Sequence, residues 1–224
     1  GTPGTPIEQA SFVPPCPLQL MYYLENWEEY IKGDDLDYLI QLACVHAQFE
    51  IIHPFLDGNG RIGRLLIPLF LYQKKKISNP VFYLSEYLEK NRTIYYNRLN
   101  EITSQNKWND WIIFFLEAIK IQAKNNSLKV KQILDLYENM KNKITDLTHS
   151  QHSIQLLDAI FDSPIFKTID IAKKTGIPKP TVSQLLKSLR DGNILQVIKP
   201  AKGRAAAILV FSELINISEG KKVF

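Results

Sequence analysis

The stretch His53-Pro-Phe-Leu-Asp-Gly-Asn-Gly-Arg-Ile-Gly-Arg64 decides the fold that we expect, because it places a glycine-rich turn between two helical patterns. Before it, apolar residues recur every three or four positions from about residue 36 to Ile51, which predicts a largely buried helix. After Gly60 the same period continues to the basic run at 74–76, where positive charge suits a helix C-terminus. The turn is therefore expected to connect two helices.

The turn has the composition of a phosphate site. Gly58 and Gly60 permit positive φ, so that backbone N–H groups at the start of a helix can point at one anion. Arg61 and Arg64 are three residues apart and therefore share a face of the new helix. Asp57 suits Mg²⁺, which is usually held by one carboxylate together with substrate phosphates. The expected ligand is a nucleotide that carries Mg²⁺.

Two other residues of the turn complete this site, and two other interpretations of the turn are disfavoured. Asn59 adds a neutral donor, and His53 is placed to take a proton from an attacking hydroxyl, as histidines do near neutral pH. The glycines, including Gly63, also fit G-x-G-x-x-G, but that dinucleotide fingerprint needs a preceding strand, and the P-loop pattern is absent from the sequence. A plain helix–helix turn is disfavoured because six polar or glycine residues converge on one anion.

These residues resemble the signature of the Fic (Fido) family, H-x-F-x-[DE]-G-N-G-R-x-x-R, at every defined position. The resemblance covers about residues 1–120. It extends to a target-docking flap at Ser11, Phe12 and Val13. Fic proteins are helical, and most transfer AMP from ATP to a Ser, Thr or Tyr hydroxyl of a protein substrate. The resemblance therefore implies a protein adenylyltransferase.

The family also implies a role for each motif residue. His53 would be the general base, Asp57 the Mg²⁺ ligand, and Asn59 a holder of the α-phosphate. Arg61 would contact the β-phosphate side and Arg64 the γ-phosphate. From a later helix, Tyr95 would line the adenine pocket, although aromatic residues at helical spacing are more often core. His46, seven residues before the motif, is expected to be a packed histidine.

The resemblance leaves the control of activity open. Many relatives carry an inhibitory helix with the pattern [ST]-x-x-x-E-[GN], which is absent from the 224 residues. Residues 1–6 show neither a starting Met nor a basic region followed by an apolar run, so we expect a fragment that begins inside the flap. An inhibitory helix before residue 1, or one supplied by a partner, is therefore part of the expectation.

The composition is that of a soluble globular protein, with 45% hydrophobic residues, 22% charged residues and a net charge of +4. The longest apolar run, Leu65–Tyr72, is far shorter than the roughly 18 to 20 residues of a membrane span, so no membrane contact is expected. Cys16 and Cys44 lack metal-ligand spacing and fit a reducing cytosol. We expect a cytoplasmic protein.

The rest of the chain is predicted to be mainly helical in two domains. Helices are expected at 18–31, from a cap at Asp34 to Pro54, at 85–105 and at 108–147 with a break near Asn125, and no strand is expected before residue 190. Shorter helices follow at 154–161, 168–175 and 180–190, with strands at 194–198 and 206–211. The expected fold class is mainly α, with a Fic-type helical bundle at 1–148 and a small winged helix-turn-helix domain at 149–224.

The third helix of the winged domain has an apolar face at Val182, Leu185, Leu186 and Leu189. The polar residues opposite that face and the basic residues of the hairpin loop are candidates for DNA contacts: Thr181, Ser183, Gln184, Lys187, Lys202 and Arg204. A protein-binding or dimerising winged helix is the other interpretation, because the fold alone does not decide function. A dimerising winged helix would make the chain a homodimer, whereas a protein-binding one would take a different partner.

Two functions of different class follow from these observations. The first is an AMP-transferring enzyme whose winged helix selects a target or a location. The second is a DNA-binding regulator whose Fic part senses nucleotide. The intact motif favours the enzyme, because a sensor does not need His53, while a donor other than ATP stays open. The charge is uneven: residues 149–224 carry eleven Lys and Arg against six Asp and Glu, whereas residues 1–148 carry sixteen against seventeen.

Overall fold

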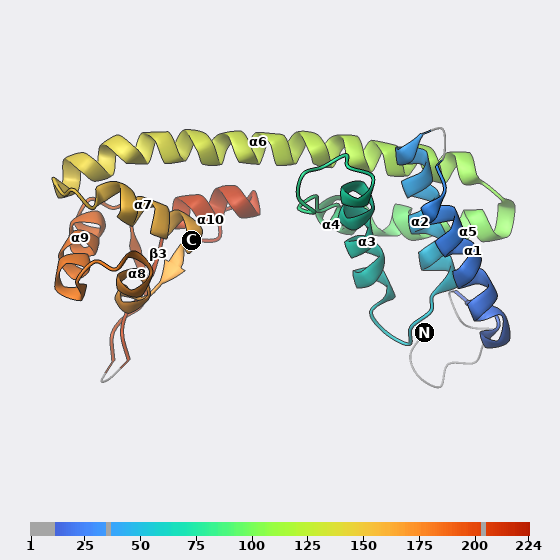
Figure 1. Cartoon of the computed structure of the whole chain (residues 1–224), viewed down its shortest axis with the longest axis horizontal. Helices are drawn as coiled ribbons and strands as arrows, with labels where there is room; N and C mark the ends of the chain where they lie inside the picture. The colour runs from blue at the N-terminus through green and yellow to red at the C-terminus, as the bar shows by residue number, and fades with distance from the viewer. Residues whose placement is uncertain (1–11, 35–36, 203–204) are drawn as a thin grey trace. The chain divides into compact units, whose positions relative to one another are not determined.

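The computed structural model describes residues 12–34, 37–202 and 205–224. The chain divides into two compact units, Gly1–Asn125 and Asn126–Phe224, and each is described by itself. The elements of the first unit are η2 (Pro17–Gln19), α1 (Leu20–Lys32), α2 (Tyr38–Ile52), α3 (Asn59–Gln73), α4 (Ser85–Lys90), α5 (Arg92–Gln105) and the first part of α6 (Trp108–Thr148) (Figure 1). Within the described ranges, none of the helices is long and apolar enough to cross a membrane.

Helix α2 forms the centre of the first unit. It begins at Asp37, whose carboxylate accepts the N–H groups of Leu39 and Ile40 at 2.7 and 3.3 Å. The predicted cap at Asp34 was therefore wrong by three residues. Two indole N–H groups hydrogen-bond to carbonyl groups of α2. Trp27 Nε1 of α1 donates to the Val45 carbonyl at 2.9 Å, and Trp111 Nε1 of α6 donates to the Ala43 carbonyl at 2.8 Å. Helix α2 is therefore enclosed by α1 and α6.

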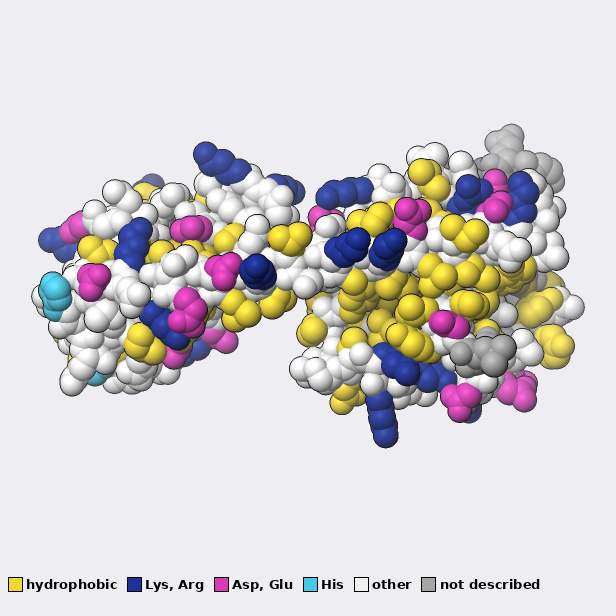
Figure 2. Space-filling view, turned by 90° about the horizontal axis from the view of Figure 1, so that it is seen from above, with side chains coloured by type: hydrophobic (Ala, Val, Ile, Leu, Met, Phe, Trp, Pro, Cys, Tyr) yellow, Lys and Arg dark blue, Asp and Glu magenta, His cyan; other side chains and the backbone are white. Residues whose placement is uncertain are grey.

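The core of the first unit comes from α2, α3, the region of α4, α5 and the start of α6. Its fully buried members include Leu42, Ile67, Leu84, Trp111 and Phe115. In the space-filling view, hydrophobic side chains also gather in a broad patch on the visible face of this unit, at the right of the picture (Figure 2). The mainly helical fold expected from the sequence is confirmed.

The second unit contains the end of α6, α7 (Ser153–Asp162), β1 (Ile165–Phe166), α8 (Thr168–Thr175), α9 (Lys179–Asp191), β2 (Gln196–Lys199), β3 (Ile208–Val210) and α10 (Ser212–Glu219). Its strands form an antiparallel sheet in the order β1-β3-β2, with Ile165 opposite Val210 and Val197 opposite Leu209. Gly176, at φ 71°, ends α8 and turns the chain into α9. In chain order, the helices α7, α8 and α9 precede the β2–β3 pair, as the sequence predicted, and the winged helix-turn-helix assignment stays a prediction.

Several boundaries differ from the expectation. Helix α6 runs without the break predicted near Asn125, and the predicted helix at 85–105 is divided at Asn91. Both β1 and α10 were missed. The sequence placed a domain boundary at 148, but the compact units divide within α6. The division lies there because Leu136, Met140 and Ile144 of α6 pack into the core of the second unit.

Candidate active site

The loop between α2 and α3 has a left-handed backbone at both ends. His53, the C-cap of α2, has φ 50° and ψ 56°, and Gly58, the N-cap of α3, has φ 87°. Glycine adopts this conformation without a steric penalty, but it is uncommon for a residue with a side chain. Such strained positions are found at functional sites, and here the two residues bracket a short loop that ends at a helix N-terminus.

Asn59 closes this loop. Its Oδ1 accepts the Phe55 N–H at 2.9 Å, and its Nδ2 donates to the Phe55 carbonyl at 2.5 Å. The side chain is 2% exposed. Both polar groups are thus bonded to the Phe55 backbone, so the side chain closes the loop, and its expected contact with an α-phosphate stays a prediction.

The first turn of α3 presents N–H groups that the helix does not use. The first helical hydrogen bond of α3 is donated by Ile62 to the Gly58 carbonyl at 3.0 Å, so the N–H groups of Asn59, Gly60 and Arg61 precede the ladder. They lie at the positive end of the α3 dipole. This geometry suits an anion, as the glycines of the motif predicted.

Two charged side chains flank this turn on the solvent side. Asp57 Oδ1 accepts the Gly58 N–H at 2.7 Å, and Asp57 Oδ2 accepts a hydrogen bond from Arg61 Nη2 at 3.1 Å. The side chains of Asp57 and Arg61 are 91% and 75% exposed. An exposed pair of this kind contributes little to stability, so both groups are available to a ligand at small cost. One exposed carboxylate beside an anion site fits Mg²⁺ held mainly by water and phosphate.

The side chain of Arg64 reaches back over the first turn of α3. Its Nη1 is 3.1 Å from the position that a Cβ on Gly60 would take. Among the described residues Arg64 forms no ion pair with a carboxylate within 4.0 Å. Within the motif, Arg61 is therefore paired with Asp57, whereas Arg64 lies beside the helix start with its charge not engaged in an ion pair among the described residues.

The ring of His53 is oriented by its own helix. Its Nδ1 lies 3.3 Å from the Glu50 carbonyl oxygen. A carbonyl oxygen can only accept, so Nδ1 carries the hydrogen and Nε2 retains its lone pair. Phe12 of the predicted flap packs against the ring with centroids 5.7 Å apart. Val13 is half exposed, and Ser11 lies outside the described residues.

Behind the motif a buried chain of hydrogen bonds joins α2, α3 and α5. His46 Nδ1 donates to the Gly63 carbonyl at 3.1 Å, and its Nε2 accepts the Tyr95 hydroxyl at 3.1 Å. Burial lowers the pKa of His46 to about 4, so the ring is neutral at neutral pH. The prediction of a packed histidine is confirmed. Tyr95 is 3% exposed among Trp111 and other rings, so we assign it to the core and not to an adenine pocket.

Glu50 is the residue of this network that sequence reasoning missed. It is 8% exposed, and burial raises its pKa to about 7, opposed by the positive charge of Arg64. The only signal in the sequence is its position one helical turn before His53. Its importance depends on contact with α3, which a local pattern does not reveal.

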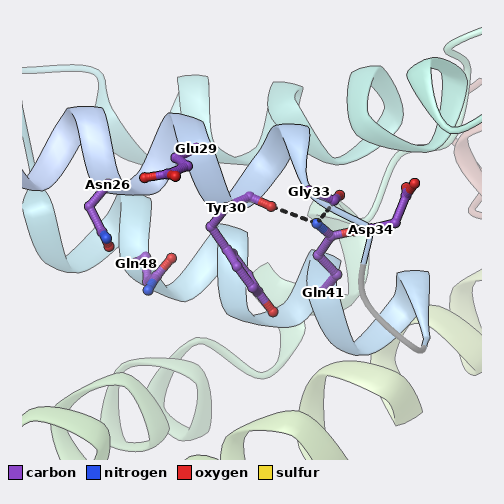
Figure 3. A pocket seen from close by; sticks show the side chains of 7 residues that line it. All are labelled: Asn26, Glu29, Tyr30, Gly33, Asp34, Gln41 and Gln48. Atoms are coloured by element: carbon purple, nitrogen blue, oxygen red, sulfur yellow. Dashed lines mark hydrogen bonds between the residues drawn. The ribbon is translucent and has the colours of Figure 1, made fainter.

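One groove of the first unit lies beside this site, and a separate pocket lies between α1 and α2. A groove of about 610 Å³ is lined by Phe12, Val13, Pro14 and Pro15, by Tyr23 of α1, and by Ile51, Asn100, Thr103 and Ser104. Because Phe12 also touches His53, the groove begins beside the candidate base. The second pocket, about 480 Å³ between α1 and α2, contains no motif residue (Figure 3). In it Gln41 Nε2 donates to the Tyr30 and Gly33 carbonyls at 2.7 and 2.9 Å, which anchors the end of α1.

In the second unit the predicted face of α9 is observed. Val182, Leu185, Leu186 and Leu189 are buried. Ser183, Gln184 and Lys187 are exposed and Thr181 is half-buried, so the candidate nucleic-acid residues share the outer side of the helix. Lys202 is exposed, and its backbone pairs with Ala205. Arg204 lies outside the described residues.

A helical unit with a glycine-rich helix N-terminus, two arginines and an oriented histidine defines a class of protein that handles phosphorylated ligands. In the comparison with known proteins, residues 3–71 match the family model described as Fic/DOC family. The stretch of the chain that holds the motif is therefore similar to that family. Across 88% of the chain the fold also resembles a crystal structure of a Fic family protein from Desulfovibrio desulfuricans, of which it covers 56%, with a TM-score of 0.50 and 19% identity.

Curated relatives carry names that state an activity. The chain is 28% identical over 170 residues to a probable protein adenylyltransferase of Aquifex aeolicus, covering 74% of this chain and 47% of that protein. It is 33% identical over 70 residues to the protein adenylyltransferase Fic of Drosophila grimshawi, and 30% identical over 70 residues to the protein adenylyltransferase fic-1 of Caenorhabditis elegans. Those 70 residues are 30% of this chain and 14% of either relative. The chain thus spans about half, or less, of the curated relatives that it matches.

Proposed function

We propose that this chain is a protein adenylyltransferase, which transfers AMP from ATP to a Ser, Thr or Tyr hydroxyl of a protein. The observation that carries the proposal is the loop itself, in which an oriented histidine and an unused helix N-terminus with two arginines meet within twelve residues. Relatives named protein adenylyltransferase support it.

In this reaction the substrate hydroxyl oxygen attacks the α-phosphorus of ATP. The new P–O bond forms as the bond from the α-phosphorus to the β-phosphate oxygen breaks, and pyrophosphate leaves. His53 Nε2 receives the hydroxyl proton, since Nδ1 already carries a hydrogen directed at the Glu50 carbonyl. A positioned base of this kind contributes roughly 10²- to 10⁴-fold.

The charge that develops on the phosphate oxygens would meet donors that are already in place. The N–H groups at the start of α3, together with Arg61 and Arg64, need little reorganisation to receive it. Asp57 would hold Mg²⁺, which would neutralise phosphate charge when bound. The groove beside Phe12 has the position to receive the segment that bears the hydroxyl.

The test is transfer of labelled AMP to proteins of a cell lysate in the presence of Mg²⁺. His53→Ala is expected to abolish transfer while leaving ATP binding within about twofold of the parent, because the histidine acts on the hydroxyl proton and not on the phosphates. His149→Ala, which removes a histidine outside the motif, is the matched control. Transfer by His53→Ala at the parent rate would show that the assigned base is wrong.

A second candidate function concerns the second unit. The exposed polar side of α9 opposite a buried apolar face has the arrangement of a recognition helix, which favours DNA binding by a regulator whose Fic domain senses nucleotide. The two functions are separable, because DNA binding does not depend on His53.

A further inference from the structure

The carboxyl group of Glu50 lies against the backbone of the motif helix. A Cβ added to Gly63 would overlap Glu50 Oε1, and Glu50 Cδ lies 3.1 Å from that Cβ position. Oε1 is buried and has no hydrogen-bond partner among the described residues. A buried carboxylate oxygen without a donor is costly, so this arrangement calls for a functional reason.

The groups that face Glu50 come from three helices. From α3, Arg64 acts on Glu50 electrostatically. From α5, the Tyr95 hydroxyl lies beside Glu50 and donates its hydrogen to the neutral ring of His46, on α2 itself. Of these groups only Arg64 carries a charge at neutral pH. The ionised form of Glu50 therefore depends on one cation.

Arg64 also faces the other way, toward the anion site. Its guanidinium lies over Gly60, in the turn whose N–H groups are unused by the helix. A phosphate bound there and the Glu50 carboxylate would compete for the same cation, since Arg64 acts on Glu50 electrostatically and forms no ion pair within 4.0 Å among the described residues. A bound phosphate and an ionised Glu50 would share the single positive charge of Arg64 in a largely buried place, which is unfavourable. Glu50 removes the excess negative charge when it takes up a proton.

We propose that Glu50 is a positioning residue for Arg64, and that nucleotide binding to the motif is coupled to uptake of a proton by Glu50. This proposal depends on the proposed function in one respect, because it takes a nucleoside triphosphate as the ligand. The ionised carboxylate attracts the Arg64 guanidinium, and protonation of Glu50 removes this attraction, so that Arg64 can turn to the phosphates. Nucleotide affinity is therefore highest when Glu50 is neutral.

The expected change of nucleotide affinity with pH follows from the linkage between binding and proton uptake. The pKa of Glu50 is about 7 before binding, and the loss of Arg64 to a phosphate raises it further. A rise of about one unit makes affinity about fivefold lower at pH 8 than at pH 6, beyond any change from titration of the nucleotide itself.

The experiment is isothermal titration calorimetry of the whole chain with α,β-methylene-ATP and Mg²⁺ at pH 6 and pH 8, in two buffers of different ionisation enthalpy. For the parent chain we expect proton uptake at pH 7 and about a fivefold fall in affinity between pH 6 and pH 8. Glu50→Gln is expected to bind about fivefold more tightly than the parent at pH 8 and to lose the proton uptake.

Two further variants control the interpretation. Glu29→Gln makes the same charge change on α1 and is expected to behave like the parent. Glu50→Asp keeps a titratable carboxyl and is expected to retain a pH dependence, while circular dichroism checks that each variant is folded. Equal proton uptake and pH dependence in the parent and Glu50→Gln would overturn the proposal. Absence of AMP transfer beside pH-coupled binding would refute the proposed enzyme and leave the role of Glu50 standing.

Discussion

The missing side chain of Gly63 determines how closely α2 and α3 approach at the motif. Glu50 occupies the space that a Cβ would fill, and Phe49 Cδ1 lies 3.3 Å from the same position. The Gly63 carbonyl meanwhile accepts the hydrogen bond of His46. One glycine thus permits the contact on which both the buried network and the setting of Arg64 depend.

Gly63→Ala is expected to destabilise the chain by about 1–3 kcal/mol, because the methyl group overlaps the buried Glu50 carboxyl and crowds the Phe49 ring. Chemical denaturation checks the free energy of unfolding. Gly33→Ala is the matched control, since its Cβ would make only ordinary contacts at 3.5 Å. A smaller loss for Gly63→Ala in a Glu50→Ala background is expected, and strictly additive losses would contradict the assigned clash.

The neutral ring of His46 makes the first unit sensitive to acid. Its folded pKa, about 4, is below the ordinary 6.5, so stability is full above pH 6.5 and is lost as the pH falls toward 4. His46→Asn does not titrate in this range. Its destabilisation relative to the parent is therefore expected to shrink by about 2–3 kcal/mol between pH 7.5 and pH 4.5, as measured by denaturation at both values. An unchanged difference would mean that His46 is not buried in its neutral form.

At the scale of elements, local patterns predicted what local chemistry controls. The glycine-rich turn between two helices and the apolar face of α9 are observed, because glycine conformation and helical period are local properties. The uninterrupted α6 was not predicted, since the polar pair at 125–126 disfavours helix only locally. The two-residue strand β1 exists because β3 pairs with it, and no local pattern indicates such a strand.

The same limit applies to the site. His53, Asp57 and the two arginines lie within one short stretch and were found from spacing. Glu50 was missed because its partner is Gly63, thirteen positions away on another helix. The family resemblance placed Tyr95 at an adenine pocket, but the ring is buried in the core. Position in the fold, and not residue type, decides whether an aromatic ring is core, and the sequence does not give that position.

Helix α9 carries a prediction at this scale. If its exposed side binds duplex DNA, Lys187→Ala is expected to weaken binding several-fold at low salt and to reduce the slope of log affinity against log salt by about one. Lys221→Ala removes the same charge from the C-terminal tail and is expected to have a smaller effect. Titration of labelled duplex DNA at several salt concentrations measures both. Equal losses for the two variants would indicate general electrostatic attraction and not a recognition helix.

At the scale of the molecule, charge and packing divide the chain in the same sense. Residues 149–224 carry eleven basic residues against six acidic ones, while residues 1–148 are nearly balanced. Each compact unit also has its own buried apolar cluster, one around Leu42 and one around Leu157. Separate cores are the property that lets domains fold and lose structure independently.

Two matched leucines test this independence, since Leu42 and Leu157 are both fully buried, one in each unit. Truncation to alanine costs about 2–5 kcal/mol at such positions. Leu157→Ala is expected to raise amide hydrogen exchange within 126–224, to leave exchange within 37–125 unchanged and to preserve nucleotide affinity, whereas Leu42→Ala should do the reverse. Hydrogen exchange followed by mass spectrometry measures both regions in one sample. If either variant raised exchange equally across both regions, the chain would be a single cooperative unit, and losses of nucleotide and DNA binding could no longer be traced to one unit.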